Sequence, residues 1–225
     1  MNRLYLVRHG ENPANVTRQF SYRLVDYPLN KKGVLQARQT ARYFSGMRID
    51  EIYASPLRRA VETAQIIAAP LGLTPQMDEN FREMNVGDLE RFPPTPENWA
   101  LHCQITDAWQ RGEKDVRFPG GESCAELWAR FQAGLKSVLA GKDGKNILIA
   151  GHGGLFVHTL ADLCGNLSDR QENFNINHNC SITEVLVHGC NGRLDAELVR
   201  WADHSHLWGE AAELLTGIPE NIPLN

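Results

Sequence analysis

The sequence of 225 residues predicts a three-layer α/β/α sandwich with a mostly parallel central sheet and a lid insertion. Short apolar runs alternate with longer segments whose apolar residues recur at helical spacing, a pattern typical of α/β folds. Two of these runs end in a histidine beside glycine, and one stretch in the middle of the chain lacks both periods. The length suits a single domain over residues 1–225.

The expected strands are short apolar runs bounded by turn residues. The first run ends abruptly in Arg8-His9-Gly10 and the third in Gly151-His152-Gly153, which places a histidine at each strand end. The last two strands are joined through the turn residues 189–192. The five predicted strands span residues 4–7, 52–54, 147–150, 182–187 and 194–201.

Apolar residues spaced three and four apart predict four helices, and the first three have start signals. Asn30 precedes the first apolar stripe as its cap. Before the second stripe, Ser55 is placed as the cap and Pro56 in the first turn, where a missing N–H costs nothing. Ser123 and Glu126 form a capping-box pattern before the third. The four stripes lie at 34–44, 57–71, 127–138 and 155–163, the last in a helix that begins near Gly154.

The segment between Gly87 and Gly120 follows neither period and is rich in proline and aromatic residues. An irregular insertion of this length is typical of a lid or a substrate loop. We therefore expect a lid over about 88–120. After it, a tail over about 208–225 is expected to hold a short helix and a proline-containing end.

Composition excludes several classes of protein. The chain has 23 Lys and Arg against 27 Asp and Glu, so it has no basic excess to attract nucleic acid. Its longest uncharged stretches, 63–77 and 146–161, are too short and too interrupted to span a membrane. The start does not read as a signal peptide, and the five cysteines lack a C-x-x-C pair, which fits a reducing compartment. We expect a cytoplasmic protein without nucleic-acid or membrane partners, in which the edge strand at 194–201 leaves a homodimer open.

The two strand-end histidines predict an anion-binding site. If the strands are parallel neighbours, His9 and His152 face one crevice at the carboxyl edge of the sheet. Glycine on either side lets the backbone approach a ligand, and the following helix directs its positive end there. Arg58 and Arg59 stand in the first turn of another helix at this edge, where a bound anion would offset their unfavourable interaction with the helix dipole. We expect one of them on the surface and the other in the crevice.

Five motifs, in order along the chain, resemble the histidine phosphatase superfamily, which includes cofactor-dependent phosphoglycerate mutases and many phosphatases. The resemblance runs from Arg3 to about His206 and so covers nearly the whole chain. The motifs are Arg8-His9-Gly10-Glu11, residues 26–33, residues 55–64, Glu83 with Gly87, and Gly151-His152-Gly153.

The resemblance implies a role for each matching residue. His9 matches the nucleophile that becomes phosphohistidine, and Glu83 matches the acid that protonates the leaving oxygen. Histidine attacks only when neutral, and its ordinary pKa near 6.5 leaves most of it neutral at pH 7. Arginine forks suit phosphate oxygens, so neither a metal nor a cofactor is required. The residues that match the phosphate pocket are Arg8, Asn15, Arg59 and His152.

The sequence departs from the family pattern in two places. Many relatives have Thr or Ser where this chain has Asn12. Many phosphatases of the class read Gly-Asp-Trp-Glu-Gly after the acid, whereas residues 87–91 here read Gly-Asp-Leu-Glu-Arg. We expect a differently shaped start of the lid and unchanged phosphoryl chemistry.

Other histidines and aromatic residues are weaker candidates. His204 and His206 are spaced like zinc ligands, but no further ligand stands near them, so no metal site is expected. Trp99 and Trp109 either line a substrate pocket or pack in the core. Structural or surface positions are expected for His102, His158, His178 and His188.

The leading hypothesis is a metal-independent phosphatase that hydrolyses a small phosphomonoester through phospho-His9, with a small phosphorylated metabolite as its partner. The alternative is a phosphoglycerate mutase that returns the phosphoryl group to phosphoglycerate. A more remote alternative is a non-catalytic binding member of the same fold. For the mutase, the cations available in the lid to bind a substrate carboxylate are Arg91, Arg111, Lys114 and Arg117.

Overall fold

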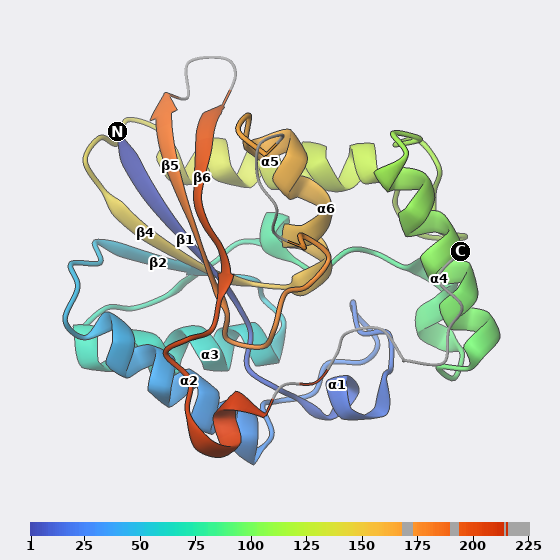
Figure 1. Ribbon diagram of the computed structural model, residues 1–225, viewed down its shortest axis with the longest axis horizontal. Coiled ribbons are helices and arrows are strands. Elements are labelled where there is room, and N and C mark those ends of the chain that lie inside the picture. Colours follow the sequence, from blue (N-terminus) through green and yellow to red (C-terminus); the bar gives the residue numbers. More distant parts are fainter. Residues whose placement is uncertain (168–172, 190–193, 214, 216–225) are drawn as a thin grey trace.

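The computed structural model describes residues 1–167, 173–189, 194–213 and 215 (Figure 1). Its centre is a six-stranded sheet in the order β3-β2-β4-β1-β5-β6. The first four strands of this order are parallel, and β5 and β6 run antiparallel to their neighbours. All five predicted strands are present, and the two-residue edge strand β3 is an addition. The strands are β1 (Asn2–Arg8), β2 (Glu51–Ala54), β3 (Gln76–Met77), β4 (Asn146–Gly151), β5 (Ile182–Gly189) and β6 (Asp195–Asp203).

Helices cover both faces of the sheet, which confirms the three-layer prediction. Figure 1 shows α2 and α3 on one face and α5 and α6 on the other. Short 3₁₀ helices supplement them at Ala69–Leu71, Glu79–Phe81, Gly87–Arg91 and Gly209–Ala212. The α-helices are α1 (Pro13–Thr17), α2 (Lys31–Phe44), α3 (Arg58–Ala68), α4 (Pro96–Gln110), α5 (Cys124–Leu139) and α6 (Gly153–Leu163).

Alternating residues of the central strands build two hydrophobic cores. Leu4 and Leu6 of β1 belong to the cluster formed with α5 and α6, whereas Tyr5 and Val7 belong to the cluster formed with α2 and α3. All four side chains are at most 4% exposed. Burial of each contributes about 1.5–3 kcal/mol of transfer free energy. Both cores therefore hold β1 and β4 rigidly, and with them the strand ends that bear the two histidines.

The helix starts follow the sequence signals with one exception. The Asn30 side chain accepts a hydrogen bond from Gly33 N at 2.8 Å, and Ser123 and Glu126 form the predicted capping box. Ser55, however, is not a helix cap, because α3 begins at Arg58 with Leu57 as an N-cap that lacks a side-chain hydrogen bond. The chain needs a turn between β2 and α3, so the Ser55 hydroxyl lies outside the helix.

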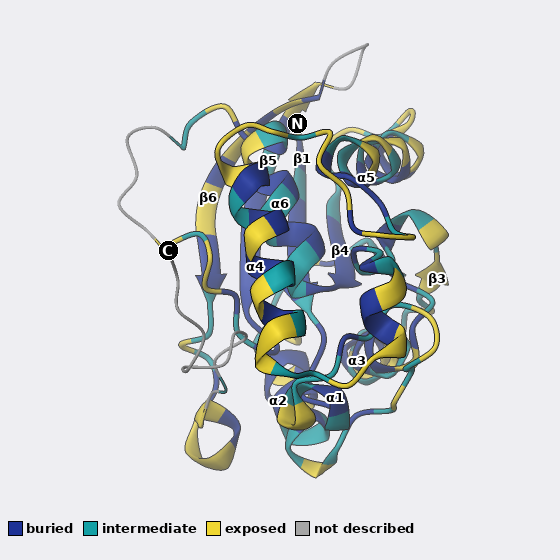
Figure 2. Cartoon of the chain, turned by 90° about the vertical axis from the view of Figure 1, so that its right-hand side faces the viewer, coloured by how far each residue is buried: buried dark blue, intermediate teal, exposed yellow. Residues whose placement is uncertain are grey.

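The prediction that the insertion over 88–120 is irregular was wrong. It contains the 15-residue helix α4. Thr95 caps this helix through its bond from Asn98 N, and proline occupies the first position. Figure 2 shows one face of α4 exposed and another turned inward. The inward face includes His102 and Thr106 beside Trp99. Because polar residues occupy part of the buried stripe, the sequence lacks the regular spacing of apolar residues that predicts a helix.

Several expectations concern the rest of the chain. The 3₁₀ helix Gly209–Ala212 provides the predicted short helix of the tail, while the turn residues 190–192, residue 214 and the tail from 216 lie outside the described residues. β6 is an edge strand of the sheet, as pairing between subunits requires, and the homodimer stays a prediction. Within the described part of the chain, no helix has the length and apolar character needed to cross a bilayer.

Candidate active site

His9 and His152 lie side by side at the carboxyl edge of the sheet. β1 and β4 pair in parallel with Arg8 opposite Gly151, so the residues that follow are neighbours. The two imidazole centroids are 5.2 Å apart. His9 lines a cavity of about 470 Å³, whereas His152 is fully buried beside it and does not line the cavity. The strand-end pattern therefore correctly predicted that the two histidines are neighbours. Of the two, His9 lies at the cavity surface and His152 lies behind it.

The hydrogen bonds of His9 assign its tautomer. Nδ1 lies 2.7 Å from the carbonyl oxygen of Gly10, which accepts only, so Nδ1 has the proton. Nε2 then has the lone pair, and it accepts a hydrogen bond from Arg59 Nε at 3.1 Å. Burial lowers the pKa of His9 well below its ordinary value, and the charges of Arg59 and Arg8 lower it further. His9 is therefore neutral, with the lone pair of Nε2 directed at the guanidinium that meets the cavity.

Arg59 is the buried member of the arginine pair and Arg58 the exposed one, as predicted. Nη1 of Arg59 donates to Ser21 Oγ at 2.9 Å, and Nη2 of Arg59 donates to the Ser21 carbonyl at 2.8 Å. Asp26 lies 3.9 Å from Nη1. Burial lowers the pKa of Arg59 to about 10, so the group stays charged at neutral pH. The loop around Ser21 thus fixes the cation that touches His9.

Arg8 contributes a second, half-buried cation to the cavity wall. Its Nη1 donates to the carbonyl of Asn177, while its Nε is buried and has no hydrogen-bond partner among the described residues. Burial lowers the pKa of Arg8 as well. A Cβ at Gly153 would lie 3.2 Å from Arg8 Nε, so glycine at this position leaves the guanidinium its space. An anion in the cavity would complete the bonding of Arg8.

His152 is oriented by Ser55, which was expected to cap a helix. Its Nε2 lies 2.7 Å from Ser55 Oγ. Ser55 Oγ also accepts from Leu57 N at 3.3 Å, so the hydroxyl group that fixes the imidazole ring is itself held by the backbone. Nδ1 is buried and has no partner among the described residues. Burial lowers the pKa of His152 well below its ordinary value, so a neutral imidazole stands behind His9.

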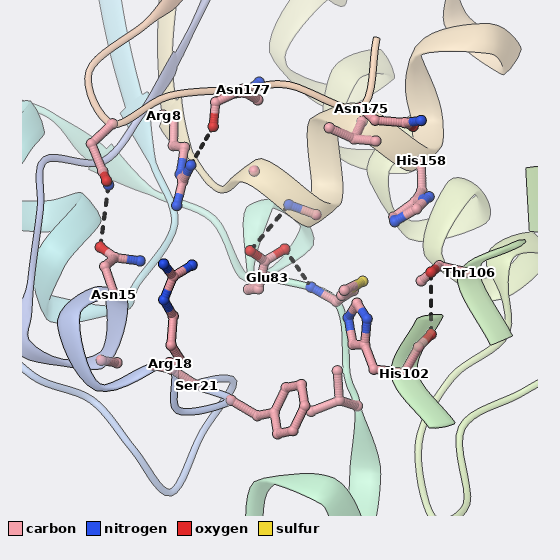
Figure 3. Close-up of a pocket in the computed structure, with 18 of the residues that line it drawn as sticks. Arg8, Asn15, Arg18, Ser21, Glu83, His102, Thr106, His158, Asn175 and Asn177 are labelled. Carbon is pink, nitrogen blue, oxygen red and sulfur yellow. Dashed lines mark hydrogen bonds between the residues drawn. The ribbon is translucent and has the colours of Figure 1, made fainter. Parts of the chain in front are cut away.

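Glu83 sits at the start of α6, in the middle of the cavity wall (Figure 3). Its Oε1 accepts from Leu155 N at 2.8 Å and from Met84 N at 2.9 Å, and its Oε2 accepts from Gly154 N at 3.2 Å. A Cβ at Gly154 would lie 2.8 Å from Oε1. The first N–H groups of a helix have no partner within the helix and can donate to an oxygen acceptor. Glycine and the helix start together fix where this carboxyl group points.

Asn15 lies in α1, which the sequence analysis did not predict. Its Oδ1 accepts from Asn12 N at 3.1 Å and from Asn179 Nδ2 at 3.2 Å, which leaves its amide nitrogen as the group directed to the cavity. Asn12 caps α1 through its side-chain oxygen. Asparagine is as good an N-cap as the Ser or Thr of many relatives. This departure from the family pattern therefore preserves the local structure.

The second departure from the family pattern contains a residue that the sequence analysis missed. Glu90 Oε1 accepts hydrogen bonds from the backbone N–H groups of all four residues 22–25, at 2.7 to 3.0 Å. Leu89 beside it is buried in the core. Glu90 thereby fixes the loop that follows Ser21, and Ser21 in turn binds Arg59. The sequence did contain a signal for Glu90. Residues 87–91 keep the glutamate of the family pattern although the residues on either side of it differ.

The far end of the cavity is formed by α4 and α6 (Figure 3). His102 and His158 line it, and His178 lines another part of the wall, which corrects the expectation of purely structural or surface positions. His188 is a surface residue near Glu197. Trp99 lines the cavity, whereas Trp109 does not and stacks edge-on against Phe118, which resolves the alternative left open for the two tryptophans.

The four lid cations that the mutase alternative requires do not line this cavity. Each instead pairs with an acidic side chain outside it. The pairs are Arg91–Asp88, Arg111–Glu113, Lys114–Asp162 and Arg117–Glu126. Among the described residues there is also no group of three or more metal-ligating side chains.

Residues 4–202 match the family model of the histidine phosphatase superfamily, branch 1, and the chain belongs to this superfamily. A probable phosphoglycerate mutase GpmB of Yersinia pestis is 35% identical over 188 residues, which cover 82% of this chain and 85% of the relative. These findings and the structures below define a phosphatase- or mutase-type enzyme.

Two solved structures are similar over most of their length. The mycobacterial glucosyl-3-phosphoglycerate phosphatase has a TM-score of 0.73 and 26% identity, and covers 90% of this chain and 99% of its own. Phosphoserine phosphatase of Entamoeba histolytica, in complex with 3-phosphoglyceric acid, has a TM-score of 0.71 and 26% identity, and covers 92% and 100%.

Proposed function

We propose that this protein is a metal-independent phosphatase that hydrolyses a small phosphomonoester through a phosphohistidine at His9. The observation that supports this best is the state of His9, a neutral imidazole whose unprotonated Nε2 meets a buried guanidinium at the cavity wall. A phosphate group entering this end meets the buried Arg59, the half-buried Arg8 and the amide donor of Asn15. Fixed donors aimed at phosphoryl oxygens are the main source of catalysis in phosphoryl transfer.

In the proposed first step, Arg59 exchanges its bond to His9 Nε2 for the phosphate oxygens, which also exposes Nδ1 of His152 to them. Nε2 attacks phosphorus, the ester P–O bond breaks, and Glu83 gives its proton to the leaving oxygen. In the second step, Glu83 takes a proton from water, whose oxygen attacks phosphorus. The P–N bond breaks, and inorganic phosphate and free His9 are released. Arg8 and Asn15 hold the oxygens through both steps.

Phosphoglycerate mutase is the second candidate, favoured by the name of the curated relative. A mutase would use the same residues but return the phosphoryl group to phosphoglycerate instead of water. It must also hold the substrate carboxylate. The lid cations pair outside the cavity, and Arg18, on the side of Asn15, is the lining cation left for this role within the described part of the chain. This arrangement supports the phosphatase over the mutase.

The test is turnover of a panel of phosphomonoesters, including 3-phosphoglycerate, by EDTA-treated protein. Inorganic phosphate and 2-phosphoglycerate are both followed, with His9→Ala as the control. The proposal expects phosphate release that survives EDTA and disappears in the variant. Formation of 2-phosphoglycerate without phosphate release would identify a mutase instead. Phosphate release at the wild-type rate by His9→Ala would contradict the mechanism.

A further inference from the structure

Charge is divided unequally between the two ends of the cavity. Within the described part of the chain, the lining cations are Arg8, Arg18 and Arg59. Figure 3 places Arg8 and Arg18 on the Asn15 side, across the cavity from α4. On α4 the charged lining residue is Asp107. An anionic substituent is therefore favoured at the His9 end and disfavoured at the α4 end.

The α4 end instead offers two uncharged imidazoles. Figure 3 shows His102 from α4 and His158 from α6 both directed into the cavity. Burial lowers the pKa of His102 to about 3, with a smaller contribution from His158. Burial also lowers the pKa of His158 to about 4. A neutral imidazole nitrogen can pair with a hydroxyl group as donor or acceptor, but it offers no positive charge to a carboxylate.

Aromatic rings surround the imidazole of His102. Its ring centroid lies 5.4 Å from that of Phe20, 5.0 Å from that of Trp99 and 5.5 Å from that of Phe118. Nδ1 is sealed from solvent and has no partner among the described residues, which leaves Nε2 as the nitrogen that meets the cavity. A ligand that reaches this end of the cavity can therefore hydrogen-bond with Nε2.

Further neutral groups surround this pair. The Thr106 hydroxyl donates to the His102 carbonyl at 3.1 Å, so its oxygen can accept a hydrogen bond from the cavity. Gln110 donates to Asn175 Oδ1 at 2.8 Å, and both residues line the same wall. Apart from Asp107, the α4 end is thus a surface of uncharged donors and acceptors bordered by aromatic rings.

We infer that the α4 end of the cavity binds an uncharged, hydroxyl-bearing group, so that the preferred substrate is a polyol or sugar phosphate and not a carboxylate-bearing phosphoester. This inference rests on the proposed phosphatase function. His102 and His158 are its specificity-determining residues, since they hydrogen-bond the hydroxyl groups remote from phosphorus. Asp107 repels a carboxylate at that position.

Two six-carbon phosphoesters test the inference, because sorbitol 6-phosphate and 6-phosphogluconate differ in a terminal CH₂OH or carboxylate. We expect kcat/KM to be at least about 10-fold higher for sorbitol 6-phosphate, since removing one good hydrogen bond alone costs about 3- to 10-fold. Asp107→Asn should improve the use of 6-phosphogluconate more than that of sorbitol 6-phosphate. Equal kcat/KM values, or no turnover of either compound, would overturn the inference.

The histidines are tested by His102→Phe and His158→Phe, which keep a ring and remove the nitrogens. Relative to acetyl phosphate, which is too short to reach α4, kcat/KM for sorbitol 6-phosphate should fall about 3- to 10-fold in each variant, through KM. His188→Phe is the matched surface control. Equal losses on both substrates would overturn the inference, and acetyl phosphate turnover shows that a variant is folded. Absence of His9-dependent acetyl phosphate hydrolysis would instead refute the proposed function itself.

Discussion

The two ends of the cavity are built in different ways. At the His9 end, charged side chains at the carboxyl edge of the sheet are held by hydrogen bonds, as Arg59 is by Ser21. At the α4 end, neutral side chains on two helices are held by ring packing, as His102 is by Trp99. Fixed charge suits the phosphoryl group that every substrate shares, and neutral polarity suits the part that varies. Changes at the first end should slow all substrates, and changes at the second should alter the preference among them.

The largest effect in the comparison is expected from Glu83→Gln, which keeps the shape of the side chain but cannot supply a proton. General acid catalysis contributes about 10²- to 10⁴-fold, so kcat for an alkyl phosphate should fall by about 10³. For p-nitrophenyl phosphate, whose leaving group needs no proton, the loss should be far smaller. Steady-state kinetics on both substrates measure this, with exposed Glu79→Gln as the control. Equal losses on the two substrates would argue against an acid role for Glu83.

Arg59→Lys should reduce kcat by about 10²-fold on all substrates alike, because one fixed donor to a developing anion contributes about that much. Lysine keeps the charge but cannot reach His9 and Ser21 together as the guanidinium does. Its neighbour Arg58 is exposed, and Arg58→Lys provides a matched control on the same helix turn. Similar kinetics for the two variants would show that Arg59 does not organise the phosphate end.

Glu90→Gln tests whether the loop at 22–25 positions Arg59. A neutral amide replaces a carboxylate oxygen that accepts four backbone hydrogen bonds. We expect kcat to fall about 10-fold and the free energy of unfolding by about 1.5–3 kcal/mol. Thermal and urea unfolding, together with kinetics on short and long substrates, measure both. Exposed Asp88→Asn is the control. A loss confined to one substrate would place Glu90 in specificity and not in positioning.

Acid should destabilise the protein partly through the α4 end. The pKa of His102 is about 3 in the folded protein and near 6.5 when unfolded, so between these values the unfolded chain binds more protons. Stability is therefore lost as pH falls below about 6.5, by up to about 1.4 kcal/mol per pH unit for this residue. Urea unfolding at pH 7 and pH 5 should show a smaller difference in His102→Phe than in His188→Phe. Equal differences would mean that His102 is not buried in its neutral form.

The strand ends were the part of the site that the sequence predicted best. Apolar runs interrupted by His-Gly marked β1 and β4, and their parallel pairing followed from the α/β alternation. The position in the first turn of α3 predicted that either Arg58 or Arg59 enters the site, and the family resemblance selected Arg59. In each case the signal was local, because the residue stands directly at the end of a regular element.

The remaining features depend on contacts between distant segments. Glu90 reaches the loop at 22–25, and Ser55 binds His152 instead of capping α3. Neither contact has a local pattern. The helix α4 was missed because His102 and Thr106 occupy its buried face, where only apolar residues would have revealed the period. The inferred hydroxyl-binding end requires polar residues on that face of α4. These same residues interrupt the apolar spacing by which a helix is predicted.

The most direct test of the account is to trap the phosphoryl intermediate. The protein is mixed with acetyl phosphate labelled at phosphorus, quenched within milliseconds to seconds, and digested under basic conditions that preserve phosphohistidine. We predict an acid-labile label on the peptide that contains His9, at up to one group per chain, and no label in His9→Asn. A turning-over enzyme without label, or label on His152, would contradict the assignment of His9 as the nucleophile.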